Sequence, residues 1–164
     1  MIRDHGIRSA IEFGCGDGNQ LSLIWYPSYI GLDISASAII RCIEKFRNDA
    51  TKSFFVYDPA AFRDAGGIFR SDLALSLDVI YHIVSDSIFE SYMMHLCGAA
   101  ARTLIVYSTD TDEVESDHIR HRAFTKWMAT NQPAFSLRRV IPNPHAGVGP
   151  QQSNAAFFCF DRIA

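Results

Sequence analysis

The chain has 164 residues, 48% of them hydrophobic, and a formal net charge of −3 at pH 7. This length fits a single domain spanning residues 1–164, and the apolar content excludes a disordered chain. No apolar run reaches the roughly 18 residues of a membrane span, and residues 1–9 lack the apolar core of a signal peptide, so we expect a cytoplasmic protein without a membrane partner.

Segments with strand and helix patterns alternate along the chain. The predicted strands are 7–13, 29–33, 53–57, 73–77, 103–107, 135–141 and 155–160. Short helices are predicted at 21–25 and 60–65. Ser35 is expected to cap a helix with the apolar face Ile39, Ile40, Ile43 and Phe46. Ser87 and Glu90 match a capping box for a helix that buries Phe89, Tyr92, Met93 and Leu96, and a last helix is predicted at 119–129 with Phe124 and Trp127 on one side.

This alternation is typical of a parallel sheet covered by helices. The last two predicted strands are joined by residues 142–150, which have no helical pattern, so these two strands must run antiparallel. The sequence therefore predicts an α/β fold of five strand–helix units closed by a β-hairpin. Its seven-stranded sheet is mostly parallel with an antiparallel last strand, and helices lie on both faces.

The strongest local signal is the turn Glu12-Phe13-Gly14-Cys15-Gly16-Asp17-Gly18, between a predicted strand and a predicted helix. Glycines here let the backbone turn tightly and approach a ligand. Asp33 ends the next predicted strand, where a carboxylate can accept hydrogen bonds from both hydroxyls of a nucleoside ribose. The alternative is a plain tight turn followed by a helix-capping aspartate.

The turn favours one nucleoside cofactor over another. A dinucleotide fingerprint, G-x-G-x-x-G, has a glycine where Asn19 stands. Glu12 and Asp17 add negative charge, which repels a pyrophosphate but suits a sulfonium ligand that also carries an ammonium group. The chain is also short for the second domain of most dehydrogenases. We therefore expect S-adenosylmethionine, and an NAD-binding oxidoreductase is the weaker alternative.

These motifs resemble those of the class I S-adenosylmethionine-dependent methyltransferases over nearly the whole chain. The turn is similar to that family's first motif, Gly31–Ser35 to the second, Val56–Asp58 to the third and Leu75–His82 to the fourth. The resemblance implies a methyltransferase whose cofactor-binding residues are Glu12, Gly14, Gly16, Gly18, Asp33, Ile34, Asp58, Leu77 and Asp78. Asp33 would hold the ribose, Ile34 would pack on the adenine, and Asp58 would contact the adenine amino group.

The resemblance has one departure, because many relatives have helices before the first strand that cover the cofactor. Here only residues 1–6 precede the first predicted strand. We therefore expect an open site, or one covered by a second copy in a homodimer, another partner, a larger substrate or the late loop. A non-catalytic S-adenosylmethionine-binding or scaffold protein is the alternative to an enzyme.

Candidate catalytic residues follow from the rule that ligands bind outside the carboxyl ends of the strands. They are His82 and Tyr81 after the fourth predicted strand, and His118, His121 and His145 in later segments. A neutral imidazole can take a proton from a hydroxyl, and the ring of Tyr81 can face the sulfonium cation. The alternative is that His82 only hydrogen-bonds the backbone. Asp78 and Asp110 have no further ligand at a suitable spacing, so no metal site is expected.

The acceptor and the partners are inferred by elimination. The N-P-P-Y-like sequence of DNA amino-methyltransferases and the paired glutamates of protein arginine methyltransferases are absent after the fourth strand. Basic residues are scattered, apart from His118–Arg122 and Arg138–Arg139, which argues against duplex nucleic acid. We therefore expect a small-molecule or glycan acceptor, which the cluster near Arg120 would suit if it is anionic.

The cysteines Cys15, Cys42, Cys97 and Cys159 form no C-x-x-C pair, and four reduced thiols are expected.

Overall fold

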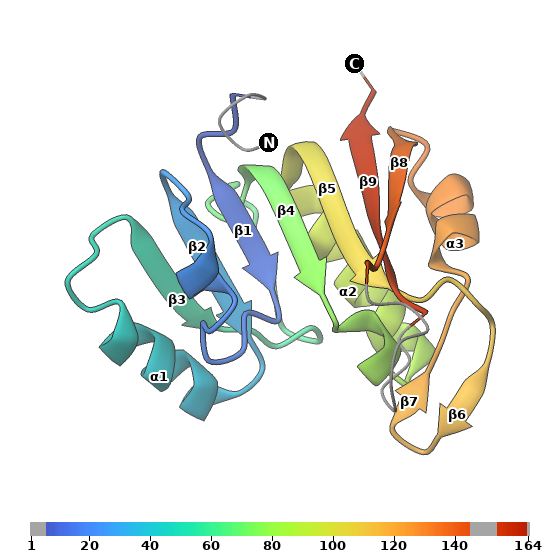
Figure 1. Cartoon of the computed structure of the whole chain (residues 1–164), viewed down its shortest axis with the longest axis horizontal. Helices are drawn as coiled ribbons and strands as arrows, with labels where there is room; N and C mark the ends of the chain where they lie inside the picture. The colour runs from blue at the N-terminus through green and yellow to red at the C-terminus, as the bar shows by residue number, and fades with distance from the viewer. Residues whose placement is uncertain (1–5, 145–153, 164) are drawn as a thin grey trace.

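The structure of this protein, a computed structural model, describes residues 6–144 and 154–163. A seven-stranded sheet runs through it in the order β3 (Lys52–Val56), β2 (Tyr29–Asp33), β1 (Ala10–Phe13), β4 (Ser71–Leu77), β5 (Ala100–Ser108), β9 (Ala156–Arg162) and β8 (Phe135–Pro142) (Figure 1). Neighbouring strands from β3 to β5 are parallel, and β9 is antiparallel to β5 and β8. The predicted α/β fold with its antiparallel last strand is confirmed.

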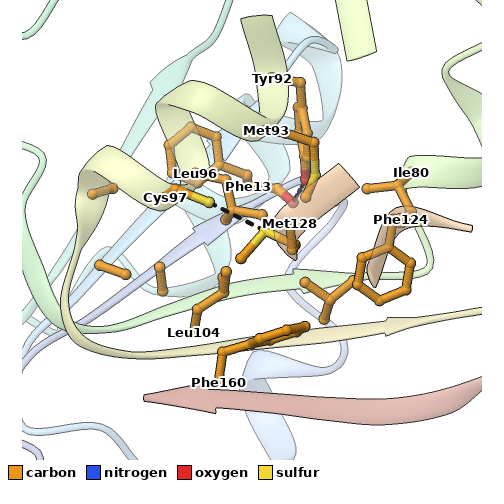
Figure 2. Close-up of a cluster of buried hydrophobic side chains, with 14 of the residues drawn as sticks. Phe13, Ile80, Tyr92, Met93, Leu96, Cys97, Leu104, Phe124, Met128 and Phe160 are labelled. Carbon is orange, nitrogen blue, oxygen red and sulfur yellow. Dashed lines mark hydrogen bonds between the residues drawn. The ribbon is translucent and has the colours of Figure 1, made fainter. Parts of the chain in front are cut away.

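Helices lie on both faces of the sheet, and the side chains of β1 alternate between the two cores that these helices cover. In β1, Ile11 and Phe13 belong to the core under α2 (Asp86–Ala99) and α3 (Phe124–Asn131). Ala10, on the other face, belongs to the core under α1 (Ala36–Lys45). Figure 2 shows the larger core, where side chains of α2 and α3 meet β1, β5 and β9. The labelled residues of this core include Phe13, Met93, Leu96, Leu104, Phe124 and Phe160.

The helix α1 begins as predicted but buries a narrower face than predicted. The Oγ of Ser35 accepts a hydrogen bond from the backbone N–H of Ala38 at 3.3 Å. Ile39 is buried, whereas Ile40 and Ile43 are 56% and 50% exposed. The reason is that α1 packs at one edge of the sheet, against β2 and β3.

Two predicted short helices are absent or reduced. Residues 60–65 form a turn in which the backbone N–H groups of Ala61 and Phe62 donate to the carbonyl of Asp58. The segment predicted as a helix at 21–25 is one 3₁₀ turn, η1 (Leu21–Leu23). None of the helices in the described part of the chain is long and apolar enough to cross a membrane.

The largest difference from prediction lies before α3. Residues predicted to begin that helix instead form a two-stranded hairpin, β6 (Val114–Ser116) and β7 (Ile119–Arg120). The carboxylates of Asp112 and Asp110 accept hydrogen bonds from the backbone N–H groups of Ala123 and Thr125. Because these acidic side chains satisfy the first free N–H groups, the helix starts only at Phe124.

The start of α2 also differs from the predicted capping box. Ser85, not Ser87, is the N-cap residue, and its Oγ faces the N–H of Ile88 at 3.5 Å. Ser87 lies inside the helix, where its hydroxyl is 3.1 Å from that of Ser85. The predicted buried residues of this helix are nevertheless confirmed, because both starting points give the same helical period.

Candidate functional site

The glycine turn after β1 adopts a conformation that side chains rarely allow. Gly14, Gly16 and Gly18 have φ values of +86°, +56° and +73°. A Cβ on Gly14 would lie 2.3 Å from a methyl group of Val79, so this position has no room for a side chain. A Cβ on Gly16 would meet nothing within 4 Å. The backbone of Gly16 is therefore open to a ligand.

Asp33, at the end of β2, holds this turn in place. One carboxylate oxygen accepts a hydrogen bond from the N–H of Gly16 at 2.8 Å, and the other accepts from the N–H of Ser35 at 2.8 Å. A carboxylate has about four acceptor positions, so further positions remain for a ligand. Asp33 thus joins the glycine turn to the start of α1.

A cavity of about 500 Å³ opens beside this turn, at the carboxyl ends of β1, β2 and β4. The predicted site residues that line it are Gly14, Asp33, Ile34, Leu77, Asp78 and His82. The sequence interpretation missed other lining residues, including Tyr57, Ile83, Val84 and Ile88. Ile83 and Val84 directly follow the fourth motif, so extending that motif by two residues would have found them.

Four predicted cofactor residues, Glu12, Gly16, Gly18 and Asp58, lie outside the cavity lining. The carboxylate of Asp58 is exposed and accepts a hydrogen bond from the N–H of Ala60 at 2.9 Å. Gly18 is buried, and a Cβ on it would lie 2.8 Å from the ring of Phe46 and 3.1 Å from the sulfur of Cys42. Gly18 therefore allows α1 to pack close to the turn.

Glu12 is buried beneath the turn, with 4% of its surface exposed. The hydroxyl of Tyr29 donates a hydrogen bond to one of its carboxylate oxygens at 2.5 Å. Burial raises the pKa of Glu12 from its ordinary value of 4.5 to about 7, against the lowering effect of that hydrogen bond, and the nearby charge of Asp33 raises it further. The carboxyl is therefore partly protonated near neutral pH.

A cluster of ring side chains lies where β4 ends. Asp78 has a φ of +60°, and one of its carboxylate oxygens accepts a hydrogen bond from the hydroxyl of Tyr81 at 2.9 Å. The ring centroid of Tyr81 is 4.4 Å from that of His82 and 5.8 Å from that of His121. Burial and the bond to Asp78 raise the pKa of Tyr81, so its phenol stays protonated. Tyr81 itself is not among the residues that line the cavity.

The remaining candidate histidines are separated by the fold. The Nδ1 of His121 lies 2.5 Å from the Oγ1 of Thr109, which follows β5. His118 is exposed in the turn between β6 and β7. His145 lies outside the described residues. The structure therefore brings together Tyr81, His82 and His121, from the 3₁₀ turn η2 (Ile80–His82) and the end of the hairpin.

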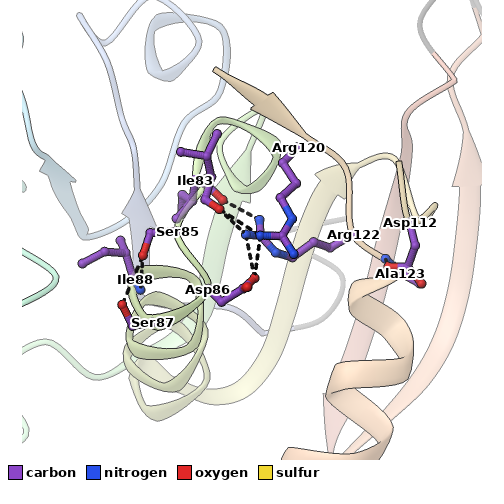
Figure 3. Close-up of polar contacts among 10 residues, drawn as sticks. Ile83, Ser85, Asp86, Ser87, Ile88, Asp112, Arg120, Arg122 and Ala123 are labelled. Carbon is purple, nitrogen blue, oxygen red and sulfur yellow. Dashed lines mark hydrogen bonds and ion pairs between the residues drawn. The ribbon is translucent and has the colours of Figure 1, made fainter. Parts of the chain in front are cut away.

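Two arginines attach the hairpin segment to the cavity wall (Figure 3). The guanidinium of Arg122 donates to the carbonyls of Ile83 and Val84, the latter at 2.9 Å, and its side chain is 11% exposed. Arg120 donates to the carbonyl of Val84 at 3.1 Å, and both arginines pair with Asp86, at 2.9 and 3.1 Å. These cations, which the sequence suggested for an anionic acceptor, make bonds within the protein.

Comparisons with known proteins give one sequence relative. No model of a known protein family matches the chain. A small RNA 2′-O-methyltransferase of Arabidopsis thaliana is 31% identical over 100 residues, a match that covers 54% of this chain. The chain spans only 11% of the length of that relative.

Solved structures resemble nearly the whole chain. The methyltransferase domain of bacterial CtHen1-C has a TM-score of 0.76 at 20% identity and covers 99% of this chain and 93% of its own. The N-methyltransferase NodS of Bradyrhizobium japonicum WM9, in complex with S-adenosylhomocysteine, has a TM-score of 0.78 at 15% identity and covers 96% of this chain and 79% of its own. The fold of this chain is that of the class I methyltransferases, as its motifs predict.

The comparisons contradict the expected partners. We expected a small-molecule or glycan acceptor and no nucleic acid, yet the sequence relative is named for methylation of RNA. The expectation relied on the absence of a broad basic face, which is a requirement of duplex binding. A single RNA strand is recognised largely by stacking and a few polar contacts, so a net charge of −3 does not exclude it.

The buried carboxyl of Glu12 predicts a pH-dependent stability. Its pKa is raised in the folded protein, so its contribution is fully present below pH 4.5 and is lost as the pH rises through about 7. Glu12→Gln should remove this loss and, at about pH 8, unfold with a free energy about 3 kcal/mol higher than wild type. Chemical denaturation of both proteins from about pH 4.5 to 8 measures the difference. Parallel stability curves would contradict the assignment.

Proposed function

We propose that this chain binds S-adenosylmethionine and transfers its methyl group to a 2′-hydroxyl of RNA. The observation that carries the proposal is one cavity lined by Gly14 of the glycine turn, by Asp33 and by His82. The glycine turn can approach a nucleoside, and Asp33 can hold its ribose. His82 can accept a proton from the methyl acceptor. The choice of acceptor is supported by the sequence relative named for 2′-O-methylation of small RNA.

The cavity fits the expected methyl donor in size and chemistry. Its volume of about 500 Å³ lies within the range of about 300–1,000 Å³ that is typical of small-ligand sites. Gly16 presents open backbone, and Asp33 offers carboxylate oxygens, whereas Ile34 is 73% exposed and offers an apolar surface to a base. Bound there, the sulfonium supplies a methyl group that an acceptor oxygen takes in line with the departing sulfur.

The chain's own residues would then handle the hydroxyl of the acceptor. His82 is exposed and lines the cavity, so a neutral imidazole there can accept the proton that the hydroxyl loses as its bond to the methyl carbon forms. Tyr81 packs against His82 and is itself fixed by Asp78. His121, held by Thr109, has its ring centroid 5.8 Å from that of Tyr81 and would add a polar group beside the acceptor.

The proposed reaction is tested with a single-stranded RNA, S-adenosylmethionine and the purified chain. Mass spectrometry should detect the addition of one methyl group to the RNA. A DNA of the same sequence is the matched control, because it lacks the 2′-hydroxyl and should remain unmodified. Methylation of the DNA would reject the ribose hydroxyl as acceptor, and no methylation of any RNA length or end structure would reject RNA.

Asp33→Ala should weaken binding of S-adenosylhomocysteine about 10- to 150-fold, which corresponds to about 1.5–3 kcal/mol for a hydrogen bond to a charged group. Glu44→Ala is the matched control, because this carboxylate is exposed on α1 and lies outside the cavity lining, and the affinity of that variant should be unchanged. Calorimetric titration measures both. Equal losses in the two variants would reject the ribose assignment of Asp33.

His82→Ala should lower turnover by about 10²- to 10⁴-fold while the affinity for S-adenosylhomocysteine stays nearly the same. His118→Ala serves as the comparison, since His118 is exposed in the hairpin turn and should have little effect. Single-turnover methylation and calorimetry separate the two quantities. If cofactor affinity and melting temperature fall together in His82→Ala, His82 has a structural role instead.

A further inference from the structure

A second hollow lies on the face of the sheet that carries α1, and Leu77 lines both this hollow and the cofactor cavity. It has a volume of about 1270 Å³, and we call it the sheet-face groove. Its floor consists of side chains of β4, β5 and β9, including Leu73, Leu75, Ile105 and Cys159. One wall is the segment Leu23–Trp25, which begins at the last residue of η1 and leads toward β2.

Several large apolar side chains that line the groove are exposed. Leu23 is 85% exposed, Trp25 is 60% exposed and Ile163 is 55% exposed. The helix on this face, α1, packs against β2 and β3 and leaves β4, β5 and β9 uncovered within the described residues. Contiguous apolar surface of this kind marks an interaction site in soluble proteins.

The rim of the groove is basic. Arg102, Arg138 and Arg139 line it, and Asp161 is the one carboxylate among its described lining residues. The strand β8 has a bulge here, because Leu137 pairs with Phe160 and Arg139 with Cys159, which leaves Arg138 as the extra residue. A bulge re-aims a side chain, and this one brings two successive arginines to the same rim. Arg138 pairs with Asp161 at 3.2 Å, so the local charge remains positive.

We propose that the sheet-face groove docks an amphipathic α-helix of a partner, with its apolar stripe on the floor and acidic side chains toward the arginine rim, Arg139 in particular. The four neighbouring strands that line the groove, β4, β5, β9 and β8, span roughly 14 Å, and a helix with its side chains is about 10–12 Å wide. The apolar floor matches one face of such a helix, and the arginines match its acidic flank. This proposal is independent of the methyl acceptor.

A second copy of this chain fits the groove less well. An isologous dimer through this surface would bring the arginine rims of the two copies together, and like charges in an interface are unfavourable. The charge of the rim therefore selects a partner of opposite sign.

Two synthetic helical peptides test the proposal on the intact chain. Both have the same leucine stripe and no tryptophan, and they differ in having glutamate or lysine flanks. Trp25 lines the groove, so docking should shift its fluorescence to shorter wavelength, and Trp25→Phe identifies the signal of the other tryptophan. The glutamate peptide should bind at least about tenfold more tightly than the lysine peptide.

Matched variants separate the groove from the rest of the surface. Arg139→Glu should weaken binding of the glutamate peptide about tenfold. Arg41→Glu, at an exposed position of α1, should leave that binding unchanged. Leu23→Asp should also weaken binding, whereas Ile40→Asp should not, and both positions are exposed enough to leave folding intact. Equal binding of the two peptides, no change in Trp25 emission, or a dimer by sedimentation that Leu23→Asp dissociates would each overturn the proposal.

Discussion

The carboxylate of Asp33 fixes the geometry on which the cofactor cavity depends. It accepts the N–H of Gly16 and the N–H of Ser35, so a turn after β1 and a helix start after β2 share one anchor. Parallel pairing of β1 with β2 brings these two ends to the same edge of the sheet. The left-handed glycines then let the backbone pass close to the anchor without a side chain in the way. Without the carboxylate, the parallel strand pairing or the left-handed glycines, the turn and the start of α1 would lose their common position.

The sequence was most informative where local chemistry alone decides the structure. Strand periods and the glycine turn predicted the sheet and much of the cavity, because alternation and left-handed φ values leave few alternatives. The hairpin of β6 and β7 was missed because Arg120 and Arg122 stabilise it through carbonyls of residues 83 and 84, distant in sequence. The width of the apolar face of α1 was overestimated because its helical period does not show that it packs at the edge of the sheet.

The acceptor side illustrates a different limit of the sequence. Tyr81 and His82 come from the turn after β4, whereas His121 follows the hairpin, so only the tertiary fold places the three rings together. The net charge is a sum over the whole chain. It does not describe a local cluster such as the rings of Tyr81, His82 and His121 with the carboxylate of Asp78. The candidate histidines were selected by their position after strands, and the grouping of His82 with His121 required the structure. The exclusion of nucleic acid failed for the same reason, because composition does not describe a local surface.

The two arginines of the hairpin segment have a thermodynamic consequence. Their guanidinium groups bond to the backbone of Ile83 and Val84, two residues that line the cofactor cavity. Moving the hairpin therefore requires either breaking charged hydrogen bonds or displacing the cavity wall. A ligand that favours the present position of the hairpin also favours the present shape of the cavity. By linkage, a ligand that stabilises the present cavity wall holds the hairpin segment in its present position by the same coupling free energy.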